Sequence, residues 1–489
     1  MRDTVVLINL DGAACRSLTR KLRAEQFYCR ILPAGASADQ IAGRHARGIV
    51  LAGGSTGEAA EIPNVQEVLN TGLPVLAMGD AALSLCEELG GSINMPEDEN
   101  QHLVQVYFTR DPLVEGVENG ERHFHALRTL TLAESMSTMA DSSIGVLGFR
   151  IPERSIYGLT FQVEQNDTDG MRLLTNFCRD VCGCDAWWSE ESFIERSCEE
   201  ITARVGDAEA VCAISGGVDS GVCAMLGHKA IGHKLHCIFI DNGLLRKDEG
   251  DLVEAFYREQ AGMNFLRINA GERFIGALKG VTSQREKEQI IFNTLHEVLS
   301  EAIGRFPEVR MMFSGTNYSD TIDRNGEDEP DSLHGLKLVA PLRELFKDEI
   351  RHVGEQFDLP SSIVHRQPFP GSGLALRILG EVTQEKLDIV RAADDIFRSA
   401  IEESGQSKRL WQYFATMADN PAREADEPES YVVTLRAVQA IDGAAAMPAR
   451  LPNDLLERIS ADILAAVPAV VRVLYDLTPS HNYAQVEWR

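Results

Sequence analysis

The sequence lacks any run of 18 apolar residues, so it predicts no membrane-spanning helix. It also lacks basic residues: 47 lysines and arginines stand against 74 aspartates and glutamates, a net charge of -27. A chain this acidic repels nucleic-acid phosphates, so we expect no nucleic-acid partner. The stretch from Met1 to Ile8 goes straight into a strand pattern, without the longer apolar region and cleavage site of a secretory leader.

Cysteines at metal-binding spacing are missing as well. Ten cysteines are scattered over 489 residues, a usage typical of the reducing cytoplasm, where we expect this protein to reside. Cys182 and Cys184 are too close for a usual zinc pair, and no histidine follows at ligand spacing. We interpret them as part of a structural turn that ends the first domain.

The most informative segment that is present is Ser215-Gly216-Gly217-Val218-Asp219-Ser220. It follows the apolar run 210–214 and precedes 221–226, which predicts a strand, a tight loop and a helix start. Glycines let the backbone approach a ligand, and the loop N–H groups and serine hydroxyls can face an anion. No Gly-Lys-Ser/Thr follows, so this is not a Walker loop. The pattern favours a phosphate-binding loop over an ordinary strand-to-helix turn.

This loop resembles the pyrophosphate-binding loop of the ATP pyrophosphatases. Segments 236–247, 315–320, 341–349 and 366–377, with the C-terminal Val486-Glu487-Trp488, resemble GMP synthetases. The similarity runs over nearly the whole chain, which is identified as a diverged member of that family. The resemblance implies an α/β protein with three domains: a class I glutaminase-like domain of flavodoxin type (1–186), a doubly wound parallel-sheet ATP pyrophosphatase domain (190–382) and an α+β dimerisation domain (383–489).

The resemblance also implies ATP and Mg²⁺ as ligands and assigns residues to them. Asp219, Lys347 and Asp348 would be catalytic, and Asp219 would also hold the magnesium ion. The residues that would bind ATP are Ser215, Gly216, Gly217, Val218, Asp219, Ser220, Asp241, Asn242, Gly243, Leu245, Gly315 and Thr316. A homodimer is implied by the same resemblance.

The glutaminase positions of the first domain are degenerate. In register with the class I amidotransferases, the nucleophile position after the strand 74–78 is Gly79, which has no thiol. The base position is Gln162, which cannot accept a proton at neutral pH, although Glu164 remains where the family has its orienting carboxylate. Cys86 fits a core position on the following helix. We therefore expect no glutaminase activity, and the nitrogen would come from external ammonia, an amine or a separate amidotransferase.

The acceptor side departs from the family in a consistent direction. The long acceptor lid is shortened to a stretch in which His334 and Gly335 are remnants. Asn293 stands where the family has an arginine, and His481 stands where it has a lysine. Loss of these cations weakens recognition of a dianionic phosphate. The resemblance still implies acceptor-binding residues at Arg377, Gln412, Arg472, His481, Val486 and Glu487.

We expect ATP-dependent adenylation of a carbonyl oxygen of a purine-like or related acceptor less charged than xanthosine monophosphate, followed by amination. One alternative is an ammonia-dependent GMP synthetase that still uses xanthosine monophosphate. A second is sulfur transfer to an adenylated base, which needs a reactive cysteine; Cys212 and Cys223 flank the loop but fit core positions. A third is a non-catalytic nucleotide-binding regulator.

Overall fold

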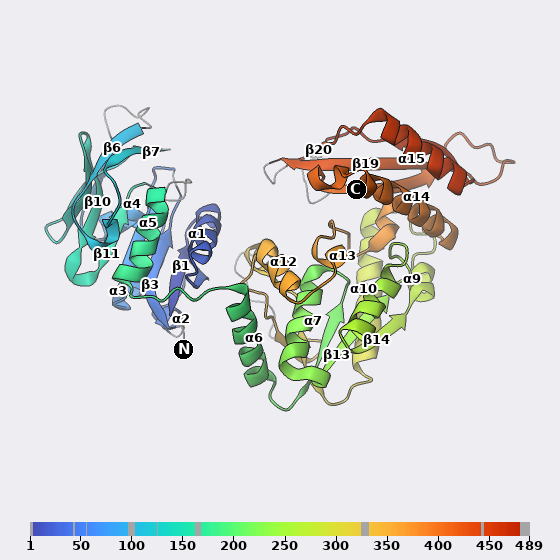
Figure 1. Cartoon of the computed structure of the whole chain (residues 1–489), viewed down its shortest axis with the longest axis horizontal. Helices are drawn as coiled ribbons and strands as arrows, with labels where there is room; N and C mark the ends of the chain where they lie inside the picture. The colour runs from blue at the N-terminus through green and yellow to red at the C-terminus, as the bar shows by residue number, and fades with distance from the viewer. Residues whose placement is uncertain are drawn as a thin grey trace. The chain divides into compact units, whose positions relative to one another are not determined.

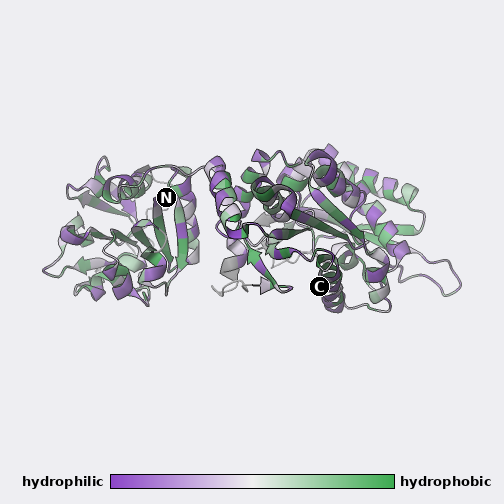
Figure 2. Ribbon diagram, turned by 90° about the horizontal axis from the view of Figure 1, so that it is seen from below, coloured by the Kyte–Doolittle hydropathy of each residue, from purple (hydrophilic) through white to green (hydrophobic). Residues whose placement is uncertain are grey.

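The computed structural model describes residues 3–42, 45–54, 56–95, 103–124, 126–161, 168–323, 332–441 and 445–479. The chain divides into two compact units, one formed mainly by residues up to 195 and the other mainly by the residues after it (Figure 1). Figure 2 shows hydrophobic residues along the strands of both units, whereas the helices carry hydrophobic and hydrophilic residues side by side. This is the pattern of sheets that are covered by amphipathic helices.

The first unit is built on an 11-stranded sheet of order β2-β1-β3-β4-β11-β10-β9-β6-β7, with β8 paired to β10 and β5 to β8. Its parallel part, β2-β1-β3-β4-β11, has the strand order of a flavodoxin-type sheet. The strands are β1 (Thr4–Asn9), β2 (Cys29–Pro33), β3 (Ala46–Ala52), β4 (Val75–Met78), β5 (Ser92–Asn94), β6 (Leu103–Phe108), β7 (Gly120–His123), β8 (Thr129–Thr131), β9 (Ser137–Ser142), β10 (Gly145–Ile151) and β11 (Ile156–Leu159).

Strands β1 and β4 confirm the two strands expected here, and their apolar runs are buried, as is that of β3. The antiparallel strands β5 to β10 were not indicated by the sequence pattern. The helices of this unit are α1 (Gly12–Ala24), α2 (Ala38–Ala42), α3 (Val65–Asn70), α4 (Asp80–Glu88) and α5 (Thr168–Asn176), and α6 (Glu190–Val205) crosses the boundary between the units.

The second unit contains a six-stranded sheet of order β14-β13-β12-β15-β17-β16, parallel except for the edge strand β16. Helix α7 covers one face, where the Cys212 thiol meets the Ser220 carbonyl, and α10 covers the other, where Leu299 packs with Val211. The strands are β12 (Glu209–Ile214), β13 (Leu235–Asp241), β14 (Asn264–Asn269), β15 (Val309–Phe313), β16 (Ser332–Leu333) and β17 (Leu336–Val339). The helices are α7 (Val218–Ile231), α8 (Glu249–Glu254), α9 (Gly271–Ala277), α10 (Gln284–Ile303), α12 (Lys347–Gln356) and α13 (Ser361–Val364). Helix α11 (Tyr318–Asp323) begins at the last residue of this part of the chain, and its residues from Ser319 onward are grouped with the first unit.

The parallel sheet expected for this region is therefore present. From β12 the chain goes to β13 and β14 on one side, and later returns to β15 on the other side. The strand order thus reverses at β12, and ligands of such sheets bind at the carboxyl end of the strands at this point. The glycine-containing loop 215–217 follows β12 directly.

A third sheet lies in the same unit. It contains β18 (Gln412–Asp419), β19 (Tyr431–Ile441) and β20 (Ala445–Pro448) as an antiparallel meander, with β21 (Val470–Tyr475) parallel to β19. The helices α14 (Gln384–Glu403) and α15 (Asn453–Ala466) pack on it through their buried apolar residues.

The division of this unit into separate domains at residues 382 and 383 stays a prediction. One hydrophobic core joins Phe274 and Ile291 beside the second sheet to Leu387 and Leu435 at the third. Among the helices that the structure describes, none is both long enough and apolar enough to cross a membrane.

Candidate functional site

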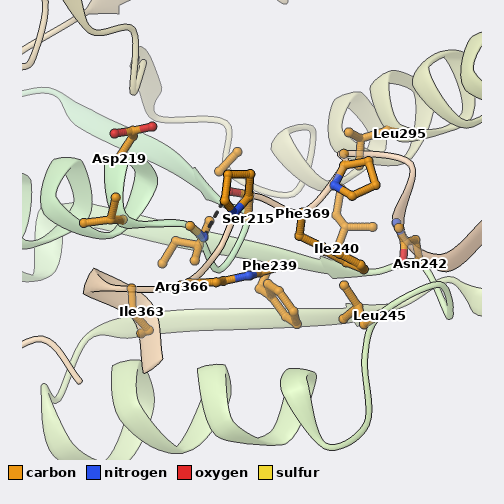
Figure 3. Close-up of a pocket in the computed structure, with 18 of the residues that line it drawn as sticks. Ser215, Asp219, Phe239, Ile240, Asn242, Leu245, Leu295, Ile363, Arg366 and Phe369 are labelled. Carbon is orange, nitrogen blue, oxygen red and sulfur yellow. Dashed lines mark hydrogen bonds between the residues drawn. The ribbon is translucent and has the colours of Figure 1, made fainter. Parts of the chain in front are cut away.

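A cavity of about 430 Å³ lies at the carboxyl ends of β12 and β13, where the strand order reverses (Figure 3). Its wall comes from the loop after β12, the start of α12, one face of α10 and the segment 366–373. Of the residues expected to bind ATP or to be catalytic, seven line it: Ser215, Gly217, Val218, Asp219, Asn242, Leu245 and Lys347.

Hydrogen bonds within the loop after β12 fix the conformation of this loop. Gly216 has a φ of 78°, which a residue with a side chain adopts only with strain. The Ser220 hydroxyl donates to the Gly217 carbonyl over 3.0 Å and lies 3.0 Å from the Ser215 hydroxyl. Helix α7 begins at Val218, so its N-terminal N–H groups lie at the cavity. This arrangement suits a phosphate group.

Asp219 and Lys347 form an ion pair at the cavity wall. Lys347 is the first residue of α12. The other carboxylate oxygen of Asp219, Oδ1, is buried and has no hydrogen-bond partner among the described residues. A buried carboxylate oxygen without a donor is well suited to a hard cation, so Asp219 fits the predicted magnesium ligand. Asp348, next in the helix, does not line the cavity.

Some residues of the loop after β13 line the cavity, whereas others lie outside it. Asn242 and Leu245 face the cavity, and Asn242 Oδ1 accepts the N–H of Leu244 over 2.9 Å. The carboxylate of Asp241 is instead paired with Arg267 at 2.6 Å and lies outside the main cavity. Gly243 lines the neighbouring hollows. The expected adenosine-side residues are therefore close together, but only two of these four line the main cavity.

Gly315 and Thr316 support the phosphate loop from behind. A Cβ built at Gly315, which follows β15, would lie 3.4 Å from the backbone of Asp219 at the start of α7, so the two segments are close to each other there. The Thr316 hydroxyl lies 2.7 Å from that of Ser314. Neither residue lines the cavity.

The segment 366–373 supplies wall residues to which the sequence reasoning gave no role. Arg366 donates to the Gly216 carbonyl over 3.0 Å and pairs with Glu249 at 2.6 Å. Phe369 lies beside the guanidinium groups of Arg246 and Arg366, 4.2 and 5.1 Å from its ring centre. The sequence feature that could have indicated this part of the wall is the run Arg-Gln-Pro-Phe-Pro-Gly, in which two prolines restrict the backbone around an aromatic residue that lies near an arginine.

Arg246 is nearly fully buried between this segment and α14. Its ion-pair partner is Asp394 of α14, 3.5 Å away. Burial lowers the pKa of Arg246 to about 9, although Asp394 opposes this effect. The cavity itself is lined by three cationic side chains, Lys347, Arg351 and Arg366, and by the carboxylate of Asp219.

The expected acceptor residues are only partly brought together. Arg377 is 1% exposed and stacks on Phe414, with 3.4 Å between its guanidinium carbon and the ring centre. Gln412 is also buried, and its Oε1 has no hydrogen-bond partner among the described residues. Arg472 is exposed on β21. The remaining three, His481, Val486 and Glu487, lie outside the described residues.

The lid remnants form a short hairpin turn between β16 and β17. His334 has a φ of 51° and its Nε2 lies 3.1 Å from Nδ1 of His296 on α10. Burial lowers the pKa of His334, and the neighbouring His296 lowers it further. The turn is therefore docked on α10 through the contact between these two imidazoles.

In the first unit, Gly79 keeps the backbone of a nucleophile elbow without a nucleophile. It joins β4 to α4 with φ 57° and ψ −131°. The buried Asp80 carboxylate accepts the N–H groups of Thr56 and Gly57 over 2.8 and 2.9 Å, and the Asp80 N–H donates to the Gly54 carbonyl over 3.0 Å. The amide of Asp80, which directly follows position 79, and the amides of Thr56 and Gly57 are thus all hydrogen-bonded within the protein. Gln162 and Glu164 lie outside the described residues.

The cysteines expected in the core are buried. Burial raises the pKa of Cys86 to about 11. Cys212 and Cys223 are at most 1% exposed, and the pKa of Cys212 is raised by its contact with Cys223 and by burial. Since a sulfur carrier needs an accessible thiolate, these cysteines do not support the sulfur-transfer alternative.

Gly373, at the end of the cavity-wall segment, offers a prediction about stability. Its φ is 60°, and a Cβ built there would lie 2.3 Å from the Leu244 carbonyl oxygen. We expect Gly373→Ala to lower the free energy of unfolding by at least ~2 kcal/mol, from backbone strain and overpacking together. Urea unfolding monitored by fluorescence measures it. Gly371→Ala, with nothing within 4 Å of its Cβ, is the matched control and should change stability little; equal losses would contradict the prediction.

Comparisons with known proteins agree over the whole chain. The family model described as the GMP synthase C terminal domain matches residues 399–488. Glutamine-hydrolysing GMP synthase of Clostridium novyi is 37% identical over 508 residues, which cover 100% of this chain and 99% of that protein. The corresponding enzyme of Clostridium perfringens is 36% identical over 510 residues and 100% of both chains. A solved structure from Thermoplasma acidophilum, described as that of a candidate GMP synthase component, covers 37% of this chain and 95% of its own at 17% identity and a TM-score of 0.33, a likeness too weak to bear on the fold.

Proposed function

Because this chain belongs to the GMP synthase family, we propose that it is an ATP-dependent, AMP-forming ligase of C–N bonds that uses ammonia or an amine from outside instead of hydrolysing glutamine. The observation that carries the ligase assignment is the cavity after β12, where an open glycine-containing loop, a helix N-terminus and the Asp219–Lys347 pair lie together. This combination of a loop, a helix N-terminus and an ion pair does not favour the alternative of a nucleotide-binding regulator without catalytic activity.

In the proposed reaction, the loop 215–220 holds the phosphates of ATP. The carbonyl oxygen of the acceptor attacks the α-phosphorus, the bond to the β-phosphate oxygen breaks, and pyrophosphate leaves. Ammonia then adds to the activated carbon, loses a proton, and displaces AMP. Backbone N–H groups and the Lys347 ammonium stabilise the departing pyrophosphate. Asp219 would hold Mg²⁺, which when bound neutralises phosphate charge.

Absence of glutaminase activity rests on Gly79 and Asp80. Gly79 offers no thiol for a thioester, and the Asp80 carboxylate occupies the amides of Thr56 and Gly57. A separate amidotransferase would then supply ammonia in the cell. The degenerate unit would serve as a scaffold.

For the acceptor, we propose a purine-like heterocycle or related carbonyl compound with less charge than xanthosine monophosphate. Asn293 on α10 carries no charge, and Arg377 is stacked on Phe414 beneath the surface. A dianionic phosphate then has fewer partners than in the family. The second candidate, amination of xanthosine monophosphate itself, is favoured by the match of residues 399–488 to the GMP synthase C-terminal domain.

We further propose the three-domain division given above and a homodimer formed through the C-terminal domain. Its strand β21 and the residues after it expose Val471, Leu474 and Leu477 to 53%, 47% and 67%. Apolar side chains so exposed on neighbouring positions are typical of an interface.

The test of function is pyrophosphate release from ATP–Mg²⁺ with xanthosine monophosphate and ammonium, with the product identified by mass. We expect ATP to bind, no GMP to form and no saturable micromolar binding of xanthosine monophosphate. A screen of uncharged purines and related heterocycles with ammonium should then give pyrophosphate and an aminated product. Formation of GMP would contradict the acceptor proposal, and no turnover with any acceptor would contradict the ligase assignment.

A further inference from the structure

Two consecutive residues of the cavity wall join the phosphate loop to the third sheet. Arg366 reaches the loop, since its Nη1 donates to the Gly216 carbonyl over 3.0 Å. Gln367 reaches β18, since its Nε2 donates to the Tyr413 carbonyl over 2.9 Å and its Oε1 accepts the Tyr413 N–H over 2.8 Å. Both residues line the cavity. They therefore connect the ATP side of the site to the strand that begins with Gln412.

The side chain of Gln367 pairs with β18 in the way that one residue of an additional β-strand would. Its side-chain amide supplies one donor and one acceptor to a single residue, as a neighbouring backbone does in a sheet. Further along the chain, Leu379 donates to the Met417 carbonyl over 2.8 Å, and Ile378 bridges to Met417. The segment from 367 to 379 thus contacts β18 near both of its ends, and Gln367 makes the contact that lies at the cavity.

A second set of contacts, through α14 and the loop after β13, also connects the phosphate loop to β18. Asp394 of α14 accepts the N–H of Ala415 on β18 over 3.1 Å and pairs with Arg246 of the loop after β13. Arg246 in turn lies over Phe369 in the cavity wall. Arg366 is also anchored by Glu249, whose Oε2 accepts the N–H of Arg246 over 3.1 Å. Hydrogen bonds and ion pairs therefore connect the phosphate loop to β18 by two routes.

We propose that Arg366 and Gln367 are positioning residues. They couple the position of β18, and of the acceptor-side Gln412 at its start, to the conformation of the phosphate loop 215–217. The chemical role of Gln412 in this inference rests on the proposed function, whereas the coupling itself does not. Arg366 keeps the loop in the conformation that binds phosphate. Gln367 couples that conformation to the position of Tyr413. Acceptor alignment then follows ATP binding, which prevents adenylate chemistry on a misaligned acceptor.

The experiment compares Gln367→Ala with the full-length wild-type protein. The first readout is hydrogen exchange of the segment 414–419 with and without α,β-methylene ATP and Mg²⁺, which needs no acceptor. Tyr413 is left out of that segment because the substitution removes its own hydrogen bond. In the wild type, the analogue should slow exchange in this segment. In Gln367→Ala this slowing should be lost, while the affinity for the analogue stays within about threefold.

The second readout is turnover with whichever acceptor the wild-type protein uses. Gln367→Ala should lower kcat on the order of 10- to 100-fold with little change in KM for ATP, because reacting groups are misplaced and not lost. Gln367→Glu, which keeps the acceptor for the Tyr413 N–H but loses the donor, should fall between wild type and Gln367→Ala. Arg366→Ala should instead weaken binding of the analogue at least tenfold.

Gln439→Ala is the matched control. Gln439 lies on β19 of the same sheet, and its side-chain amide also donates to a backbone carbonyl, that of Arg409 over 3.2 Å, but it lies away from the cavity. It should leave the exchange response and kcat unchanged. The proposal is overturned if the analogue has no effect on segment 414–419 in the wild type, or if Gln367→Ala keeps both the effect and the kcat. Loss of turnover with every acceptor, with the exchange response intact, would overturn the proposed function alone.

Discussion

Replacing Asp219 with asparagine is expected to lower ATP-dependent pyrophosphate release at least ~10²-fold, a loss of about 2.7 kcal/mol of transition-state stabilisation or more. The reason is the buried Oδ1, which has no hydrogen-bond partner among the described residues and offers a cation the full carboxylate charge. An amide at this place keeps the size but removes the charge that holds Mg²⁺ near the phosphates. The Lys347 ammonium would also lose its partner.

The measurement separates this role from folding and from the identity of the acceptor. Binding of α,β-methylene ATP is titrated with and without Mg²⁺, and we expect the gain in affinity from Mg²⁺ to disappear in Asp219→Asn. Glu355→Gln, on the same helix as Lys347, makes the same change of charge at a half-exposed pair with His365 and should have no effect. An unchanged gain from Mg²⁺ in Asp219→Asn would contradict the assignment.

Lys347→Met tests the other half of the pair. We expect it to weaken binding of the analogue at least tenfold, since an ammonium on one of the phosphates is lost, but to leave the gain from Mg²⁺ in place. Different effects of the two substitutions on the same titration would distinguish a metal ligand from a phosphate ligand. Equal effects would mean that the ion pair matters only for the shape of the loop.

The sequence predicted the parts of this site that depend on local chain geometry. Residues 215–220 were expected as a tight loop between a strand and a helix because glycines and hydroxyls follow an apolar run. The structure has a loop there, but it covers only residues 215–217, and helix α7 already begins at Val218. Such features are encoded within about ten residues of sequence, so periodicity and turn chemistry are sufficient to find them.

The parts that could not be predicted depend on contacts between distant segments. Arg366 meets Gly216 across a separation of 150 residues, and Gln367 meets Tyr413 across 46. No local pattern distinguishes these side chains from an ordinary polar surface, and only the packing of α14 and β18 places them at the cavity. The burial of Arg377 on Phe414 was missed for the same reason, because an arginine is expected to be exposed unless its partners are known.

The absence of glutaminase activity that we propose for the first unit would have two causes, the missing thiol at position 79 and the Asp80 carboxylate. Restoring the nucleophile and the base by Gly79→Cys with Gln162→His is expected to leave glutamate release from glutamine at background. The elbow at position 79 already has the required backbone, with φ 57° and ψ −131°. However, the Asp80 carboxylate still occupies the N–H groups of Thr56 and Gly57, so a tetrahedral oxyanion would meet a negative charge in place of donors.

Adding Asp80→Ala to these two changes should therefore raise glutamate release by on the order of 10²-fold over the double variant, which is the usual effect of an oxyanion donor. Removal of the carboxylate leaves two amides without their acceptor, so we also expect a loss of ~1–3 kcal/mol in the unfolding free energy of this unit. Asp80→Ala alone, without a thiol at position 79, is the control and should release no glutamate. If the double variant were as active as the triple variant, the Asp80 carboxylate would not be the barrier, and the loss of activity would lie in the nucleophile and the base alone.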